Sequence, residues 1–379
     1  MITVFYARYA YLNPGFPLFL QFLRENPPQG IRAINVSQRT PAEIERLARE
    51  SSTIAIDQSI ENAATWAEPG QFSIYRIRGD HPTSFFSEIS DQLWSVDARR
   101  LFMSNFDLHD LRVPALMERM RGKVDAVSWM FEKRPRTTSD VPAQYRDPWN
   151  STDHDPLGTW NLIREVAPVR IELPFAIAAH ELANAPVRET WDTCVPGAPY
   201  ATRTLALSSI RRQKLTVAPA RGLSRLASGV ARIMGATLPS ETASLSTIVL
   251  QQRLQRSLVR SSATTFVCGS GVAFATRKFF EVPALRSPML AYPCVGFDDY
   301  GFSNGINVVS TIPEDAGKQA RWLRSNPPIA ERIARAGQEM IIRLHKLDVR
   351  VESFAKCLRK LDQGKLNGAA FQKGEYEIY

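Results

Sequence analysis

Apolar and polar positions in the first half of the chain follow two alternating periods. Short runs that are apolar, or that alternate between apolar and polar residues, predict strands at Ile2 to Tyr6, Gly30 to Val36, Ser52 to Asp57, Phe72 to Arg78, Leu101 to Ser104, Ala126 to Phe131 and Val169 to Leu173. Stretches with a helical period lie between them, at Pro17 to Arg24, Pro41 to Glu50, Ser84 to Ala98 and Val113 to Met120. Strands that alternate with helices are typical of parallel βαβ units, so this pattern predicts an α/β fold.

The second half continues in a similar way. A strand that enters a turn is predicted at Trp191 to Gly197, and a helix is expected to open at Tyr200 to Arg203. Before it, the polar, proline-rich passage from Arg134 to Thr159 predicts a surface loop near an interdomain cleft. At the C-terminal end, we expect a helix over Val349 to Leu361 that packs back toward the N-terminal domain, followed by an exposed tail over Gln372 to Tyr379.

A short helix is predicted around Glu281. Phe280, Ala284 and Leu285 recur at helical spacing, and Glu281 lies in the first turn, where a carboxylate complements the helix dipole. A strand is expected to follow at Met289 to Tyr292. In α/β folds, ligands bind beyond the carboxyl ends of strands, where the helices begin.

The residues around this helix have the chemistry to bind a nucleotide. Glu281 would reach ribose hydroxyls, while Arg277 or Lys278 would meet phosphate. Spacing alone leaves a second interpretation open, in which Glu281 caps its own helix and the basic pair is solvated. Backbone N–H groups of Gly269-Ser270-Gly271 would line the same site, since glycine permits close approach, although the pattern favours an ordinary turn.

Asp80 and His81 form a third candidate site, directly after the predicted strand Phe72 to Arg78. Catalytic groups of α/β folds collect where parallel strands end. An aspartate beside a histidine would supply a general base for an acceptor hydroxyl, because histidine titrates near neutrality. In the alternative interpretation, Asp80 caps a turn and His81 hydrogen-bonds within it.

Length and composition limit the class of protein. The chain has 379 residues, of which 44% are hydrophobic and 22% charged, so two globular domains are expected. No run of eighteen apolar residues predicts a membrane-spanning helix, and the N-terminal apolar run is predicted to be a strand and not a signal peptide. The four cysteines form no Cys-x-x-Cys pair, which predicts free, buried thiols, a cytoplasmic location and no structural zinc site.

Positive charge is concentrated in the middle of the chain, and the net charge is +9. Residues 203–260 contain a single acidic residue, Glu241, and ten basic residues: Arg203, Arg211, Arg212, Lys214, Arg221, Arg225, Arg232, Arg253, Arg256 and Arg260. Such a stretch favours capture of an anionic partner, which is a nucleotide diphosphate, an anionic membrane surface or nucleic acid. A solvated basic face remains the alternative. The stretch contains no aromatic residue, which argues against single-strand nucleic acid as its main partner.

The order of motifs from Gln251 to His345 resembles the C-terminal half of group-1 glycosyltransferases, most closely the CgeB-like branch of spore maturation proteins. The residues that carry this resemblance are Arg277, Phe280-Glu281-Val282-Pro283-Ala284, Gly301-Phe302, Gly305, Asn307, Asn326-Pro327-Pro328, Ile333 to Gln338 and His345. Tyr200 to Arg203 and Asp80-His81-Pro82 are similar to further segments of CgeB-like proteins.

The resemblance implies a GT-B fold, in which two Rossmann-like domains face a cleft. The expected divisions are an acceptor-binding domain over residues 1–185, a nucleotide-sugar-binding domain over 186–345, and a returning helix and tail over 346–379. By resemblance, Glu281 holds the donor ribose, while Gly197 and Arg203 lie near the diphosphate. One residue departs from the pattern: many retaining members of the wider group have a second glutamate at the position of Ala273.

These expectations together predict a cytoplasmic glycosyltransferase of the hexosyltransferase type. It would move a sugar from a nucleotide-diphosphate donor, such as a UDP-sugar, to a hydroxyl of a glycan, a small molecule or a protein, without a cofactor and without a divalent metal. Two alternatives stay open. The acceptor is modified DNA, or the protein is a non-catalytic binding protein that keeps the fold, for which Ala273 is the best support.

Overall fold

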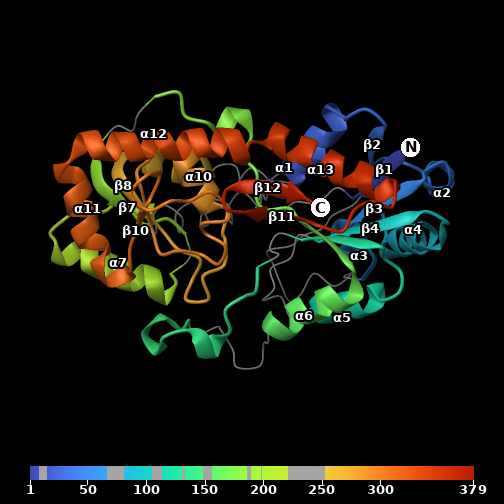
Figure 1. The fold of residues 1–379 in the computed structure, drawn as a ribbon, viewed down its shortest axis with the longest axis horizontal. Coiled ribbons are helices and arrows are strands. Elements are labelled where there is room, and N and C mark those ends of the chain that lie inside the picture. The colour runs from blue at the N-terminus through green and yellow to red at the C-terminus, as the bar shows by residue number, and fades with distance from the viewer. Residues whose placement is uncertain are drawn as a thin grey trace, which may run out of the picture.

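The fold consists of two β-sheets, one of eight strands and one of four, with helices on the faces of both (Figure 1). The computed structural model describes residues 1–7, 15–65, 81–104, 113–129, 133–147, 156–185, 189–197, 199–220 and 252–379. The predicted strand at Phe72 to Arg78 lies outside the described residues.

The larger sheet is built from the N-terminal part of the chain and its last residues. Its strands are β1 (Ile2–Tyr6), β2 (Ile31–Asn35), β3 (Thr53–Asp57), β4 (Arg99–Met103), β5 (Ala126–Trp129), β6 (Val169–Glu172), β11 (Ala369–Gln372) and β12 (Glu375–Ile378). They lie in the order β12-β11-β6-β5-β4-β3-β1-β2, and β1 to β6 pair in parallel. Each of these six strands coincides with a predicted run, so the expectation of parallel βαβ units is confirmed.

Helices from the N-terminal half cover both faces of the larger sheet. They are α1 (Gly15–Glu25), α2 (Pro41–Arg49), α3 (Gln58–Thr65), α4 (Thr83–Ser95), α5 (Val113–Met120) and α6 (Pro156–Val166). Successive side chains of a strand point to opposite faces, which separates two apolar clusters. Phe19 and Leu23 of α1 belong to the cluster on one face, while Ile44, Phe86 and Met117 of α2, α4 and α5 belong to the other.

The smaller sheet forms the second α/β unit. Its strands β7 (Trp191–Cys194), β8 (Ser262–Val267), β9 (Met289–Ala291) and β10 (Val309–Ser310) are parallel and lie in the order β10-β9-β8-β7. Helices α7 (Ala201–Arg212) and α11 (Ala316–Ser325) cover one face, and α10 (Lys278–Ala284) and α12 (Pro327–Leu344) cover the other. The predicted helix around Glu281 and the strand after it are confirmed. Residues 186–188 lie outside the described part of the chain, so the predicted boundary after residue 185 stays a prediction.

The chain returns to the larger sheet at its C-terminal end, as predicted. Helix α13 (Leu347–Asp362) follows α12 along the upper side of Figure 1, and the rings of Phe354 and Phe19 on α1 lie 5.5 Å apart. The segment from Gln372 to Tyr379 is mostly exposed, as predicted, but it is not a tail, because it forms a strand paired with β11. Strands β11 and β12 form a hairpin whose turn, Lys373 and Gly374, has φ values of 49° and 80°. Two successive positive φ values are typical of the tight turns that match the twist of a hairpin.

A buried carboxylate at the end of β6 joins the two sheets. Glu172 Oε1 accepts a hydrogen bond from the Tyr300 hydroxyl at 2.6 Å, and Oε2 accepts one from the backbone N–H of Phe371 at 2.8 Å. Tyr300 belongs to the loop after β9 and Phe371 to the C-terminal hairpin. Glu172 therefore fastens both the smaller sheet and the hairpin to the larger sheet.

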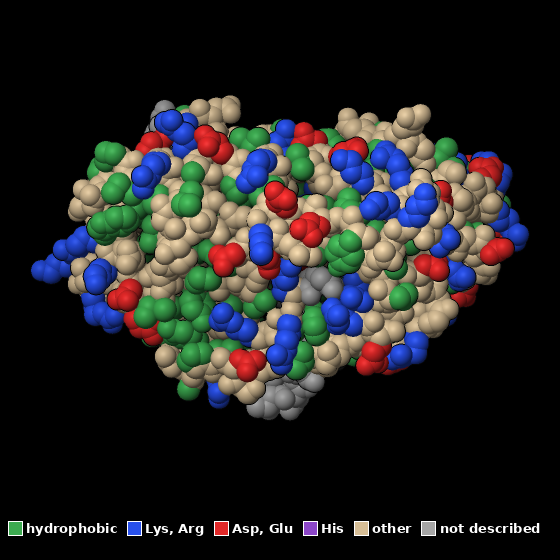
Figure 2. Space-filling view, in the orientation of Figure 1, with side chains coloured by type: hydrophobic (Ala, Val, Ile, Leu, Met, Phe, Trp, Pro, Cys, Tyr) green, Lys and Arg blue, Asp and Glu red, His purple; other side chains and the backbone are tan. Residues whose placement is uncertain are grey.

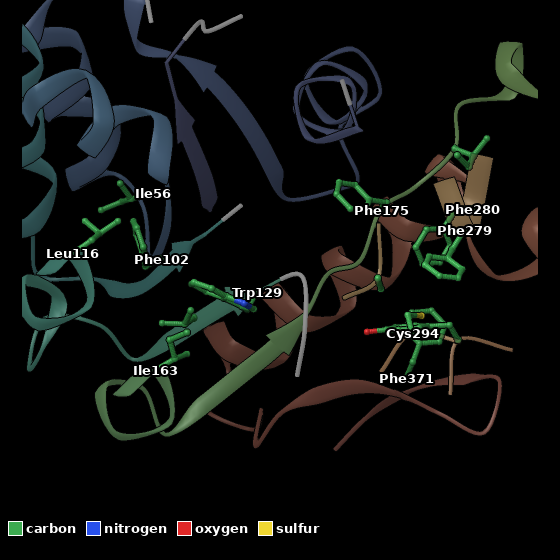
Figure 3. Packing of buried hydrophobic residues seen from close by; sticks show 14 of the residues in the cluster. Ile56, Phe102, Leu116, Trp129, Ile163, Phe175, Phe279, Phe280, Cys294 and Phe371 are labelled. Atoms are coloured by element: carbon green, nitrogen blue, oxygen red, sulfur yellow. The ribbon is translucent and has the colours of Figure 1, made fainter. Parts of the chain in front are cut away.

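One apolar cluster continues across this junction. Figure 3 shows it running from Ile56 and Phe102 in the larger sheet, past Trp129, to Phe280 on α10 and Phe371 on β11. The helix that carries Glu281 is thus packed into the same core as the N-terminal strands. Its position depends on the junction as well as on its own sheet.

The proline-rich passage differs from its prediction as a surface loop. Val141 and Tyr145 are buried in the core of the smaller sheet, and the Tyr145 hydroxyl donates to Glu314 at 2.6 Å. Asp147 is also buried, and it accepts the backbone N–H of Ala201 at the start of α7 at 2.6 Å. Apolar and hydrogen-bonding side chains between the prolines therefore attach this segment to the second unit.

All four cysteines are buried and free, as cysteine usage predicts. Burial raises the pKa of the Cys194 thiol to about 12, which keeps it protonated. Within the described residues, no helix has the length and apolar character to cross a membrane. The same part of the chain holds no group of three or more His, Cys, Asp and Glu side chains that could bind a metal ion.

Folding stability should depend on pH through His345, which lies fully buried at the end of α12. Its Nε2 donates to the Tyr300 carbonyl at 2.8 Å, and its Nδ1 accepts from Arg350 at 2.9 Å. Burial and the Arg350 charge hold the pKa of His345 well below its usual range. The native state therefore keeps the ring neutral, while the unfolded chain binds a proton below about pH 6.5, so stability falls as the pH drops through that value, by about 1.4 kcal/mol per unit from this group.

Urea denaturation of the wild type and of His345→Gln at pH 7.5 and 5.5 measures this contribution. Glutamine can still donate to the Tyr300 carbonyl but does not titrate, so the variant should lose about 1 kcal/mol less stability over this interval. Equal losses in the two proteins would contradict the assignment.

Candidate functional site

Helix α10 presents a carboxylate inside a ring of cations. Phe279, Phe280 and Val282 are buried in the core around Glu281, so the backbone of the helix is fixed. Glu281 Oε1 accepts hydrogen bonds from Arg277 Nη1 at 3.2 Å and from the Nε of Arg256, in a helical segment over residues 252–260, at 3.3 Å. Oε2 faces the Lys278 ammonium at 3.8 Å, which is an ion pair without a hydrogen bond. Oε2 is therefore the oxygen with room for another donor.

A second carboxylate, Glu181, approaches the same cations from outside the smaller sheet. It ends the short 3-10 helix η4 (Ala179–Glu181), in the segment between β6 and β7. Glu181 Oε1 accepts from Arg277 Nη2 at 2.5 Å and from Arg256 Nη2, while Oε2 accepts a hydrogen bond from the backbone N–H of Ala178 at 2.9 Å. Arg277 thus lies between two carboxylates, and its guanidinium is not free to meet a phosphate in this structure.

Gly197, Arg203 and Lys278 come together at the end of β7. Gly197 has a φ of +102°, and a Cβ built on it would lie 2.5 Å from Arg203 Nη1 and 3.1 Å from Lys278 Cε. Arg203 is buried, donates from Nη2 to the Cys268 carbonyl at 3.0 Å, and stacks over the Tyr200 ring at 4.4 Å. Three residues that sequence reasoning assigned to one ligand are therefore neighbours.

The charges of the cluster are unbalanced. Among the described residues, Arg203, Arg256, Arg277 and Lys278 gather around Glu181 and Glu281, and the Arg203 charge also acts on the carboxylate of Asp147, so cations still outnumber carboxylates. Although burial opposes its ionisation, the charges of Arg277, Lys278 and Arg256 hold the pKa of Glu281 below its usual range. Burial lowers the pKa of Lys278, and Arg203 and Arg277 add to this, while Glu281 opposes it. An additional anion at this place would relieve repulsion among the cations.

The glycine loop after β8 lies beside these residues, since it starts from the Cys268 carbonyl that Arg203 binds. Ser270 has a φ of +65° and is buried, and its Oγ has no hydrogen-bond partner among the residues that the structure describes. A Cβ on Gly269 would lie 1.7 Å from the Phe274 carbonyl oxygen, and one on Gly271 would lie 2.2 Å from that of Tyr145. Only glycine fits at these two positions. Ala273, with a φ of +56°, is fully buried in the core, so the methyl group of this residue packs inward from the loop.

His81 lies apart from this cluster. It precedes α4, donates from Nε2 to the Ser37 carbonyl at 3.1 Å, and stacks on Phe85 with 4.0 Å between ring centroids. Among the described residues, no hydrogen bond or ion pair joins His81 to the cations around Glu281. Asp80 lies outside the described residues, so the pairing of Asp80 with His81 stays a prediction.

The basic stretch divides between the interior and the surface. Arg203 and Arg256 belong to the buried cluster, whereas Arg211, Arg212 and Lys214 are exposed at the end of α7. Lys and Arg side chains stand out at the end of the molecule formed by α7 and α11 (Figure 2). Arg221, Arg225 and Arg232 lie outside the described residues. The stretch is therefore not a single solvated face.

Sequence reasoning missed Glu181 entirely and saw Arg256 only as one of many basic residues. Neither residue belongs to a motif, because each reaches the site from a segment distant in sequence. Arg256 is 25 residues from Glu281, and Glu181 is 96 residues from Arg277. The one signal in the sequence is that Glu181, beside His180, lies in an otherwise apolar passage. That signal does not identify Arg256 or Arg277 as its partners.

Comparison with known proteins places this geometry in a known fold. No protein family model and no curated protein matches the sequence. Among solved structures, Anabaena HepE in complex with UDP-glucose is similar, with a TM-score of 0.52, 9% identity, and 94% of this chain and 99% of that chain covered. Sucrose-phosphate synthase from Thermosynechococcus elongatus is similar with a TM-score of 0.48 and 10% identity, over 96% and 99% of the two chains. The chain has the GT-B fold, as predicted.

Substitution of Gly197 should be more damaging than that of a glycine with similar dihedrals elsewhere. In Gly197→Ala, the new methyl group overlaps the held guanidinium of Arg203, in addition to backbone strain of about 1–3 kcal/mol. Gly30 is a matched control, since its φ is +79° and nothing lies within 4 Å of an added Cβ. Urea denaturation should show a larger loss of stability for Gly197→Ala than for Gly30→Ala. Equal losses would show that Arg203 is not held against Gly197.

Proposed function

We propose that the protein is a glycosyltransferase that transfers a sugar, of the hexosyl type, from a nucleoside-diphosphate donor to an acceptor hydroxyl. The observation that supports this most is the convergence of the buried Glu281 and Arg203 with the half-buried Lys278 and the exposed Gly197, at a place where cations outnumber carboxylates among the described residues. The GT-B fold supports it further, because HepE, which shares the fold, is described in complex with UDP-glucose.

Glu281 is proposed to hold the donor ribose through Oε2. A carboxylate oxygen accepts hydrogen bonds from hydroxyl groups, and Oε2 receives none within the described residues, whereas Oε1 already receives two. The fixed backbone of α10 would hold this oxygen in place when the donor arrives. Glu281 is part of a charged cluster, so the alternative in which it only caps its own helix finds no support.

The donor diphosphate is proposed to lie against Arg203, Lys278 and the backbone at Gly197. Because Gly197 has no side chain, the Arg203 guanidinium and the Lys278 side chain lie directly against its backbone. Negative charge builds on the diphosphate as its bond to the sugar breaks, and fixed cations stabilise that charge. Arg277 is proposed to orient Glu281 and not to bind phosphate, since two carboxylates occupy it.

The acceptor side is proposed to be the larger sheet, with Asp80 and His81 as the candidate base. The acceptor is proposed to be a hydroxyl of a glycan, a small molecule or a protein, or modified DNA. Arg203 and Lys278 supply the positive charge that a divalent ion provides in other transferases, so we propose that no metal or cofactor is required. A cytoplasmic location and a peripheral contact of exposed Arg211, Arg212 and Lys214 with an anionic membrane also remain proposals.

A non-catalytic binding protein is the second candidate, and Ala273 favours it. The loop after β8 offers the sugar a hydroxyl from Ser270 but no carboxylate. Release of free sugar from a bound nucleotide sugar by the purified protein would favour the enzyme. Tight donor binding without hydrolysis or transfer to any of a set of glycosides would favour the binding protein.

Removal of the Glu281 charge should weaken donor binding. A hydrogen bond to a charged group contributes about 1.5–3 kcal/mol, so Glu281→Gln should raise the Kd of the best-bound nucleotide sugar about 10- to 100-fold. Isothermal titration calorimetry with UDP-, GDP-, ADP- and dTDP-sugars measures this. Glu331→Gln is the control, because Glu331 pairs with Arg286 and Arg335 on the surface of the same unit. Equal affinity of the wild type and Glu281→Gln for every donor would refute the ribose assignment.

A further inference from the structure

We propose that Glu181 is a positioning residue for the donor site, supplied by the segment that connects the two sheets. This inference rests on the proposed function and goes beyond it, because no motif and no residue of the smaller sheet implies a carboxylate at this place. Glu181 does not touch the donor in this proposal. It acts through Arg256 and Arg277, which it shares with Glu281.

The connecting segment holds Glu181 rigidly. On one side, Ile177 pairs with the chain between α12 and α13. Its N–H donates to the His345 carbonyl, and its carbonyl accepts from the Leu347 N–H, both at 2.9 Å. On the other side, Ala183 donates to the Ala284 carbonyl at the end of α10 at 3.0 Å, and Gln338 donates to the Ala183 carbonyl at 2.8 Å. The carboxylate therefore has a fixed place beside α10.

Both oxygens of Glu181 are used. Oε2 accepts a hydrogen bond from the Ala178 N–H, and Oε1 accepts one from each of the two guanidinium groups. The side chain is only 1% exposed. A buried, fully hydrogen-bonded carboxylate between two arginines is not a solvated surface charge. Its removal would leave the buried Arg277 and the half-buried Arg256 with a single carboxylate partner, Glu281, among the described residues.

The consequence for Glu281 follows from this geometry. With Glu181 present, each arginine divides its donors between two carboxylates, and only one oxygen of Glu281 is taken. Without Glu181, both guanidinium groups would turn to Glu281 and compete for Oε2, the oxygen proposed to receive the ribose. Glu181 thus keeps Glu281 available to the nucleoside.

The two halves of the donor should respond in opposite directions. Loss of the Glu181 charge makes the cluster more positive, which favours binding of a diphosphate. The released arginines would also bind Oε2 of Glu281, which disfavours binding of the nucleoside. A residue with a merely structural role would weaken the binding of both halves when it is replaced. This difference in sign separates positioning from general support of the fold.

Calorimetry on the intact protein tests the proposal. The tightest binder among UDP, GDP, ADP, CDP and dTDP is selected for the wild type, and its nucleoside and inorganic pyrophosphate are then titrated separately. Glu181→Gln should bind the nucleoside about tenfold more weakly, whereas pyrophosphate should bind equally or more tightly. Glu181→Asp keeps the charge and should restore part of the nucleoside affinity. His180→Gln, at the exposed neighbouring position, is the matched control and should bind like the wild type.

The remaining outcomes each decide against a specific statement. Unchanged nucleoside affinity in Glu181→Gln overturns the positioning role while the proposed function stands. Equal losses for nucleoside and pyrophosphate also overturn it, since they indicate general damage to the site. Failure of the wild type to bind any of the five nucleotides overturns the proposed function and this inference with it.

Discussion

Buried charge must be compensated, and the compensation of Arg277 organises much of this molecule. Its guanidinium lies between Glu281, four residues along the same helix, and Glu181, on the segment that joins the two sheets. Breaking a buried ion pair by removal of one partner typically costs about 3–5 kcal/mol, because a charge is left alone in the interior. The position of α10, the course of the connecting segment and the state of Glu281 are consequently linked through one side chain.

A second buried carboxylate, Glu172, links distant segments where the two sheets meet. Glu172 binds the Tyr300 hydroxyl and the Phe371 N–H, and the Phe371 ring in turn packs against Tyr300 and His345. The C-terminal hairpin is therefore more than an edge of the larger sheet. It closes the polar and apolar contacts that attach the smaller sheet, and the neutral state of His345 depends on the same burial.

The sequence predicted the parts of the fold that depend on local pattern. Strands β1 to β6 and the helix around Glu281 follow from periodicity, because each element buries one face or is buried on both. The hairpin at 369–378 was missed because its strands are short and its turn carries Lys373 as well as glycine. In the proline-rich segment, the prolines indicated a loop, and the pattern did not show that Val141 and Tyr145 are buried. Their burial depends on partners far along the chain.

The same distinction applies to the site. Gly197, Arg203, Lys278 and Glu281 could be named from motifs, and the structure brings them together. Glu181 and Arg256 could not, because what defines them is a contact across the fold. Arg277 or Lys278 was expected to meet phosphate, and this stays a prediction. The place of Arg277 between two carboxylates appears only once the connecting segment is positioned.

Ala273 bears on how the proposed glycosyl transfer would be assisted. A carboxylate near the sugar would favour positive charge at the anomeric carbon, but the loop after β8 offers the uncharged hydroxyl of Ser270. A hydroxyl can donate or accept a hydrogen bond, so it suits a neutral sugar without stabilising a charged one. The cations proposed to meet the diphosphate, Arg203 and Lys278, lie together beside Gly197. Any transfer by this site therefore depends mainly on stabilising the leaving group, with the sugar held by uncharged contacts.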